Sequence, residues 1–123
     1  GDLDGAEQLL EALPADVQAQ TEVERLRGQL FFDRIAGPDL SMAEAIAAVE
    51  SHPDDIAARY RLAAAQVVEG DLGAAMENFL TVMQKDRKFA DDGARQALLR
   101  CFAMLGDHPS VARYRTRMFN LLH

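Results

Sequence analysis

Small residues recur along this chain with a nearly constant period. Two series share it, with all intervals between 33 and 36 residues: Gly1, Gly37, Gly70 and Gly106, and then Gly28, Ala63 and Ala97. Glycines of the first series suit the turns that end helices, and the second series suits positions where two helices cross closely. A period of this length indicates repeated helical hairpins, each of which buries its apolar face against its neighbours.

Caps and breakers place helices between these turns. Ser41-Met42-Ala43-Glu44 has the form of a capping box, and Pro53 and Pro109 suit the first turn of a helix. Period-two alternation is missing and β-branched residues are sparse, so no strand is expected. We therefore predict an all-α fold of antiparallel helical hairpins, stacked as a short right-handed solenoid. The expected helices number about seven, at residues 3–13, 17–35, 41–50, 54–69, 72–85, 92–105 and 109–122.

Residues 56–87 resemble a single tetratricopeptide repeat. Leu62 and Ala63 precede Gly70-Asp71-Leu72, and Ala75, Phe79 and Val82 follow at helical spacing. The first residues of the chain, Gly1-Asp2-Leu3-Asp4-Gly5-Ala6, are similar to residues 70–75 two periods later. Residues 1–123 are thus expected to form one tetratricopeptide-like domain that begins in mid-repeat, as a fragment of a longer protein.

Composition and charge argue against several classes of function. No apolar stretch approaches the roughly 20 residues that span a bilayer, and the first residues lack the layout of a signal peptide, so a cytoplasmic location is expected. Up to Asp55 the chain has thirteen acidic and three basic residues, whereas the remainder has ten basic and seven acidic. An acidic half would repel phosphates, so we expect no nucleic-acid partner and no membrane association.

The residues that could carry out chemistry have structural interpretations. Cys101 has no second cysteine to pair with, and it lies on an expected buried stripe together with Leu98, Leu99, Phe102 and Leu105. His52 and His108 each precede a proline in a loop, where they resemble turn and cap residues. The chain shows no triad spacing, phosphate-binding loop or metal-ligand cluster. We therefore predict no catalytic, cofactor-binding or metal-binding residue and no enzymatic activity.

Two kinds of charged segment, acidic pairs and a basic run, also have structural interpretations. The pairs Asp54-Asp55 and Asp91-Asp92 stand at expected helix starts, where carboxylates cap free N–H groups. The basic segment Lys85-Asp86-Arg87-Lys88-Phe89 contains one aromatic residue, which is a weak signal for base stacking. Neither segment predicts catalysis or nucleic-acid binding.

The C-terminal part of the chain resembles the YbbN/CnoX family of thioredoxin-like co-chaperones. The resemblance depends on His52-Pro53-Asp54-Asp55, the run from Asp86 to Arg95, Leu98-Leu99, Leu105-Gly106, Arg113-Tyr114-Arg115 and Leu121-Leu122. The resemblance implies that this chain is the region that follows an N-terminal thioredoxin domain in that family. Such a region binds unfolding client proteins and passes them to the GroEL chaperonin or the DnaK system. The thioredoxin domain and its cysteine motif are absent here, so no redox function carries over. The family's chaperonin contact maps onto residues 110–123.

The last predicted helix has an apolar arc that is wider than packing requires. At 100° per residue its apolar side chains cover about half of the circumference, whereas a helix that seals a solenoid needs about 100°. Arg115 interrupts the arc and divides an inward stripe from a second, outward edge. The alternative is that the helix packs in a deep notch. The candidate partner-binding residues are Tyr114, Arg115, Met118, Phe119 and Leu122.

Two protein-binding functions are consistent with these features. The first is a co-chaperone module that binds a GroEL-type chaperonin, unfolded clients and DnaK. The alternative is a generic tetratricopeptide scaffold that binds a defined peptide or associates with itself. A groove that clamps an acidic tail would repeat a basic residue at one repeat position, but the corresponding positions hold Arg27, Leu62 and Gln96. Carboxylate clamping is therefore not predicted.

Overall fold

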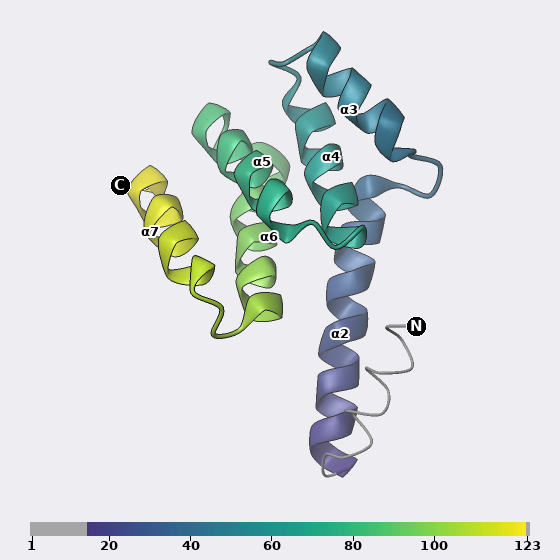
Figure 1. Cartoon of the computed structure of the whole chain (residues 1–123), viewed down its shortest axis with the longest axis vertical. Helices are drawn as coiled ribbons and strands as arrows, with labels where there is room; N and C mark the ends of the chain where they lie inside the picture. The colour runs from purple at the N-terminus through teal and green to yellow at the C-terminus, as the bar shows by residue number, and fades with distance from the viewer. Residues whose placement is uncertain (1–14, 123) are drawn as a thin grey trace. The chain divides into compact units, whose positions relative to one another are not determined.

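The computed structural model describes residues 15–122, apart from the side chains of residues 17, 18 and 21. These residues form helices without a strand (Figure 1), with the bounds α2 Ala15–Ala36, α3 Met42–Ser51, α4 Ile56–Val68, α5 Leu72–Lys85, α6 Phe89–Leu105 and α7 Ser110–Leu122. The all-α prediction is confirmed, and each helix starts and ends within a few residues of its predicted limits. The helix predicted at residues 3–13 lies outside the described residues.

The chain divides into two compact units, residues 1–31 and residues 32–123. The described residues of the first unit belong to α2, whose large apolar side chains Val23, Leu26 and Leu30 are exposed there. The last part of α2, from Phe32, belongs to the second unit together with α3 to α7. The second unit contains all the candidate site residues, so the following description concerns that unit.

Side-chain caps begin three of the helices, and two of these caps were predicted from the sequence. The Ser41 hydroxyl accepts a hydrogen bond from the Glu44 amide at 3.1 Å, and the Asp55 carboxylate accepts one from the Ala58 amide at 3.0 Å. Asp71 caps α5 in the same way. Of the predicted turn glycines, Gly1 lies outside the described residues, and the other three have positive φ angles: Gly37 at 85°, Gly70 at 91° and Gly106 at 59°. Only glycine adopts these angles without steric cost, so the repeat period has a direct backbone cause.

A row of aromatic rings forms part of the core. Phe79 of α5 lies 6.1 Å from Phe32 at the end of α2 and 5.7 Å from Tyr60 of α4, measured between ring centroids. Tyr60 in turn meets Phe89 of α6 edge-on at 5.3 Å. This row connects residues from four helices, and edge-to-face packing adds to the stabilisation that burial alone supplies.

Two of the three small residues that were predicted at close helix crossings are buried. Ala63 and Ala97 are fully buried, on α4 and α6, and both helices pack against α5. At Gly28, no described atom lies within 4 Å of the place where a Cβ would be. Among the described residues, a close crossing at Gly28 is therefore not seen.

The start of α6 differs from the prediction. Ala90, Asp91 and Asp92 have left-handed backbone angles, with φ of 53°, 55° and 66°, so the regular helix begins at Gly93. Because this backbone is not the extended conformation of a capping residue, the predicted capping by Asp91 and Asp92 was wrong. Asp92 instead pairs with Arg95 at 3.2 Å, and the Asp91 carbonyl accepts a hydrogen bond from the Gln96 side chain at 2.9 Å.

Candidate partner-binding face on α6 and α7

The inward side of α7 attaches this helix to the rest of the unit. Val111, Tyr114 and Met118 are buried there, at the three- and four-residue spacing of one helix face. Two of the five candidate residues, Tyr114 and Met118, therefore contact the protein's own core. In this conformation they position α7 and present little surface to a partner.

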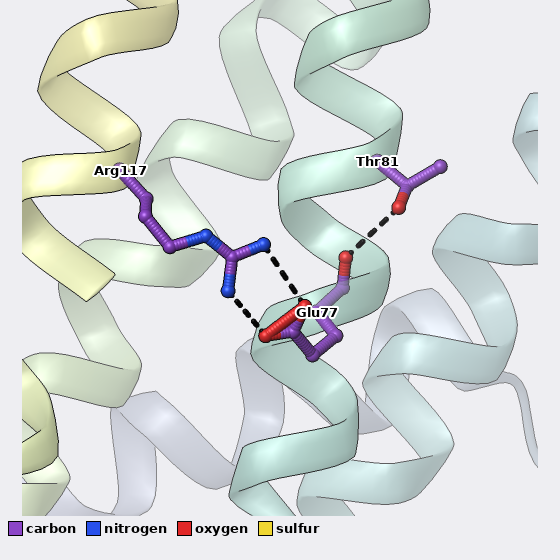
Figure 2. A network of polar contacts seen from close by, with 3 residues as sticks. All are labelled: Glu77, Thr81 and Arg117. Atoms are coloured by element: carbon purple, nitrogen blue, oxygen red, sulfur yellow. Dashed lines mark hydrogen bonds and ion pairs between the residues drawn. The ribbon is translucent and has the colours of Figure 1, made fainter. Parts of the chain in front are cut away.

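An ion pair also fixes the position of α7 against α5. Figure 2 shows the Arg117 guanidinium donating two hydrogen bonds to the Glu77 carboxylate; one of them, from Nη2 to Oε1, is 2.9 Å long. The Thr81 hydroxyl, one turn along α5, donates to the Glu77 carbonyl at 3.0 Å. The hydrogen bonds from Arg117 lower the pKa of Glu77. The guanidiniums of Arg113 and Arg117 also lie 5.1 and 5.5 Å from the Tyr114 ring centroid, where cation–π attraction holds the ring.

The outward side of α7 carries the exposed candidates. Phe119 is 58% exposed, and Leu122 is half-buried. Arg115 is exposed and its guanidinium lies 5.6 Å from the ring centroid of Phe102 on α6. Arg115 thus stands between the buried stripe and the exposed Phe119, which is the division that the helical angles predict.

Leu99 on α6 belongs to the same surface, although its sequence position predicted a buried side chain. It is 43% exposed, because it lies about 100° around the helix from the fully buried Leu98. Cys101 and Phe102 are buried as predicted, and Leu105 is half-buried. The sequence feature that distinguishes the exposed Leu99 from the buried stripe is therefore its angle around the helix axis from Leu98.

Leu99 and Phe119 lie at the same level along the neighbouring helices α6 and α7. At one end of the helix pair Arg115 covers Phe102, and at the other end Leu122 and Arg95 line the same depression. Leu99 lies between Arg95 and Phe102 along α6, and Phe119 lies between Arg115 and Leu122 along α7. The two exposed apolar side chains are therefore at matching levels of the helix pair, with an arginine toward each end. We call this surface, defined by Arg95, Leu99, Arg115 and Phe119, the α6/α7 face.

A charged depression adjoins the α6/α7 face. It is open, has a volume of about 710 Å³ and is lined by Arg87, Lys88, Asp91, Asp92, Arg95 and Leu122. Arg87 donates a hydrogen bond to the Leu122 carbonyl at 3.0 Å, which attaches the end of α7 to the segment before α6. Most of its charged groups are basic, so the depression extends the positive rim of the face.

The other candidate groups have structural roles, although that of Asp54 differs from the predicted helix cap. Cys101 is buried, and desolvation raises the pKa of its thiol to about 12. His52 ends α3, and His108 accepts a hydrogen bond from the Ser110 amide at 3.1 Å at the start of α7. Asp54 forms an ion pair with Lys85 at 2.9 Å. The Phe89 ring packs against Tyr60 in the aromatic row.

Neither a metal site nor a membrane span occurs in the described part of the chain. Within residues 15–122, no three His, Cys, Asp or Glu side chains lie close enough together to hold a metal ion. None of the described helices is both long and apolar enough to cross a membrane.

Comparison with known proteins covers the part of the chain that carries this face. A family model described as "Tetratricopeptide repeat" matches residues 34–123, which include α3 to α7. No curated protein and no solved structure shows significant similarity to the chain. The finer resemblance to the YbbN/CnoX family stays a prediction.

Proposed function

This chain belongs to the tetratricopeptide repeat family, whose members are protein-interaction scaffolds, and we propose that it is the protein-binding module of a co-chaperone. In this proposal it holds unfolding client proteins in the cytoplasm and delivers them to a GroEL-type chaperonin or to DnaK, without enzymatic activity of its own. The α6/α7 face is the proposed docking site for the chaperonin.

The observation that carries this proposal is the exposure of Phe119 on a helix that is otherwise firmly attached. Val111, Tyr114 and Met118 bury one side of α7, whereas more than half of the Phe119 side chain stays accessible on the other side. Exposed aromatic side chains beside arginines are enriched among the residues that dominate binding energy at protein interfaces. Phe119 would be the apolar anchor, and Arg115 would orient the partner.

The chaperonin as partner is supported by the resemblance of residues 110–123 to the chaperonin-contacting end of the YbbN/CnoX family. Arg113, Tyr114 and Arg115, which carry that resemblance, have two roles in the structure. The Tyr114 ring is buried with Arg113 against it, whereas Arg115 is exposed at the α6/α7 face. Client binding would use the apolar part of the same face, because unfolding proteins expose apolar segments.

A pair of point variants tests the chaperonin contact. Phe119→Ala removes the proposed anchor, and Met104→Ala is the control, because Met104 is 56% exposed on α6 at a different angle from the face. We expect Phe119→Ala to weaken chaperonin binding about tenfold or more, as for an interface anchor, and Met104→Ala to leave it unchanged. Equal affinities for wild type and Phe119→Ala, with retained helical circular dichroism, would refute the assignment. Truncation after Thr116 is less informative, because it also removes Arg117 and Met118, which attach α7.

A second measurement distinguishes a co-chaperone from a generic scaffold. A client-binding module suppresses the aggregation of a chemically denatured model protein, whereas a scaffold for one defined peptide does not. The expected result is suppression that depends on the concentration of this chain and is reduced by Phe119→Ala. Aggregation that is unaffected by the chain would favour the scaffold function.

A further inference from the structure

We propose that the α6/α7 face also binds a second copy of this chain, through the outer face of its α3, so that copies associate head to tail. This inference concerns self-association and is independent of the chaperonin.

The outer face of α3 has a shape that suits contact with another helix. Ala45 points inward and is buried, whereas Ala43, Ile46, Ala47 and Glu50 are exposed and fall on one side of the helix at three- and four-residue spacing. Alanines allow another surface to approach the backbone closely, and Ile46, 39% exposed, supplies an apolar contact in their midst. We call these four residues the α3 face.

Charge complementarity favours the α3 face as the surface that binds to the α6/α7 face of another copy. Residues 35–58 contain five acidic residues and neither lysine nor arginine. Asp54 is paired with Lys85 and Asp55 caps α4, but Glu44 and Glu50 are exposed on α3 and form no ion pair within residues 15–122. Arg115 stands at one end of the α6/α7 face. At the other end Arg87, Lys88 and Arg95 are offset in part by Asp91 and Asp92, which leaves an excess of positive charge, so opposite charges would surround an apolar contact and fix its register.

The positions of the two faces require a contact between different copies. Within residues 32–123, α3 packs on α4, whereas α6 and α7 pack on α5, so α3 and the α6/α7 pair lie on different sides of the α4–α5 hairpin (Figure 1). When the α3 face of one copy binds the α6/α7 face of the next, the first and last copies of the assembly still have one free face each. Such an association does not stop at a dimer unless the rotation between copies closes a ring.

Sedimentation of the full chain over a range of concentrations, without chaperonin, tests this inference. The weight-average mass of the wild type should rise beyond that of a dimer as concentration increases, and less steeply at high salt. Phe119→Glu or Leu99→Glu on one face, and Ala47→Arg on the other, should each weaken association about tenfold or more. Met104→Glu, outside both faces, should associate like the wild type. Circular dichroism confirms that each variant is folded.

Mixing two of these variants gives the decisive result. Phe119→Glu retains an intact α3 face, and Ala47→Arg retains an intact α6/α7 face, so an equimolar mixture should form one-to-one dimers that do not grow further. A wild type that stays monomeric, association that persists in the single variants, or a mixture that stays monomeric would each overturn the inference. Chaperonin is absent from these experiments, so a lack of self-association does not contradict the proposed chaperonin binding. A lack of chaperonin binding likewise does not contradict self-association.

Discussion

Gly93 lies at the point where α6 passes Tyr60 of α4 too closely for any side chain. A Cβ added at Gly93 would lie 3.0 Å from the Tyr60 Cζ atom and closer still to the hydroxyl oxygen. The Tyr60 ring is buried and held edge-on by Phe79 and Phe89, with centroids 5.7 and 5.3 Å away. The ring therefore has little freedom to move, and Gly93→Ala must overpack this part of the core.

Two opposing effects determine the magnitude. Overpacking a core position lowers the free energy of unfolding by about 1 to 3 kcal/mol. Gly93 is the first residue of the regular helix, where alanine gains at most about 1 kcal/mol over glycine, the value for a helix interior. Because the obstruction is a confined ring rather than a flexible chain end, we expect the cost of overpacking to exceed the gain in helix propensity by about 1 kcal/mol. A loss of this size lowers the Tm by roughly 4 °C in a domain of this size.

A double-mutant cycle with Tyr60→Phe isolates the cause. Removing the hydroxyl removes the closest contact of the new methyl group, so Gly93→Ala should cost at least about 1 kcal/mol less in the Tyr60→Phe background. Urea unfolding followed by circular dichroism measures all four proteins. If Gly93→Ala stabilises the otherwise unchanged chain, or costs the same in both backgrounds, the close approach of Tyr60 is not what requires glycine here.

Three further predictions concern the core, the thiol and the ion pair. Ala63→Leu should lower the free energy of unfolding by about 1 to 3 kcal/mol, whereas Ala57→Leu, exposed on the same helix, should have little effect; equal melting temperatures would contradict the repeat register. Cys101 should react with a maleimide at least about 100-fold more slowly in the native chain than in urea, and the chain should not reduce insulin, whereas equally fast labelling would show an accessible thiol. The pKa of Glu77 is lowered in the folded state by Arg117, so the pair stabilises the fold above the carboxyl's ordinary pKa of 4.5 and loses this contribution as pH falls through the lowered value. Glu77→Gln should therefore cost up to about 1 kcal/mol at neutral pH, and the difference from wild type should shrink near pH 3; a cost that stays constant would contradict the ion pair's role.

The sequence predicted the helices well because their limits depend on local signals. Ser41 and Asp55 cap the helices that follow them, and each acts within one turn of its own position. Glycines at Gly37 and Gly70 adopt backbone angles that other residues avoid, so their period is visible without any knowledge of packing. Such signals involve neighbours in sequence, and this is why they can be read from sequence alone.

The start of α6 could not be predicted, because its cause is not local. Ala90, Asp91 and Asp92 adopt left-handed angles that cost about 1 to 2 kcal/mol each for ordinary residues, so propensity argues against them. Near this turn, Phe89 packs against Tyr60, about thirty positions earlier in the sequence, and Gly93 leaves room for the same ring. Tertiary contacts of this kind override local preference, and sequence periodicity does not reveal them.

The candidate face was predicted in part for a related reason. Helical angles separate Phe119 from the inward stripe of α7 correctly, because that division depends only on one helix. The same reasoning treated Leu99 as buried, since an apolar residue next to Leu98 and Phe102 fits a core stripe equally well. Leu99 lies about 100° around α6 from the buried Leu98, and which of these two leucines points inward depends on how α6 packs on α5.

Neighbouring residues of α7 differ in role: Met118 attaches the helix to the rest of the unit, and the next residue, Phe119, is the proposed anchor for a partner. Met118 is buried and Phe119 is 58% exposed, because consecutive residues on a helix point about 100° apart. The inward stripe, with the Arg117–Glu77 pair beside it, fixes the orientation of the helix, so the direction of Phe119 is determined before any partner binds. A rigidly presented aromatic side chain loses little conformational entropy on binding, which favours its use as an anchor. This arrangement accounts for the width of the apolar arc of α7: one part of the arc holds the helix in place, and the other part leaves Phe119 exposed at the proposed docking site.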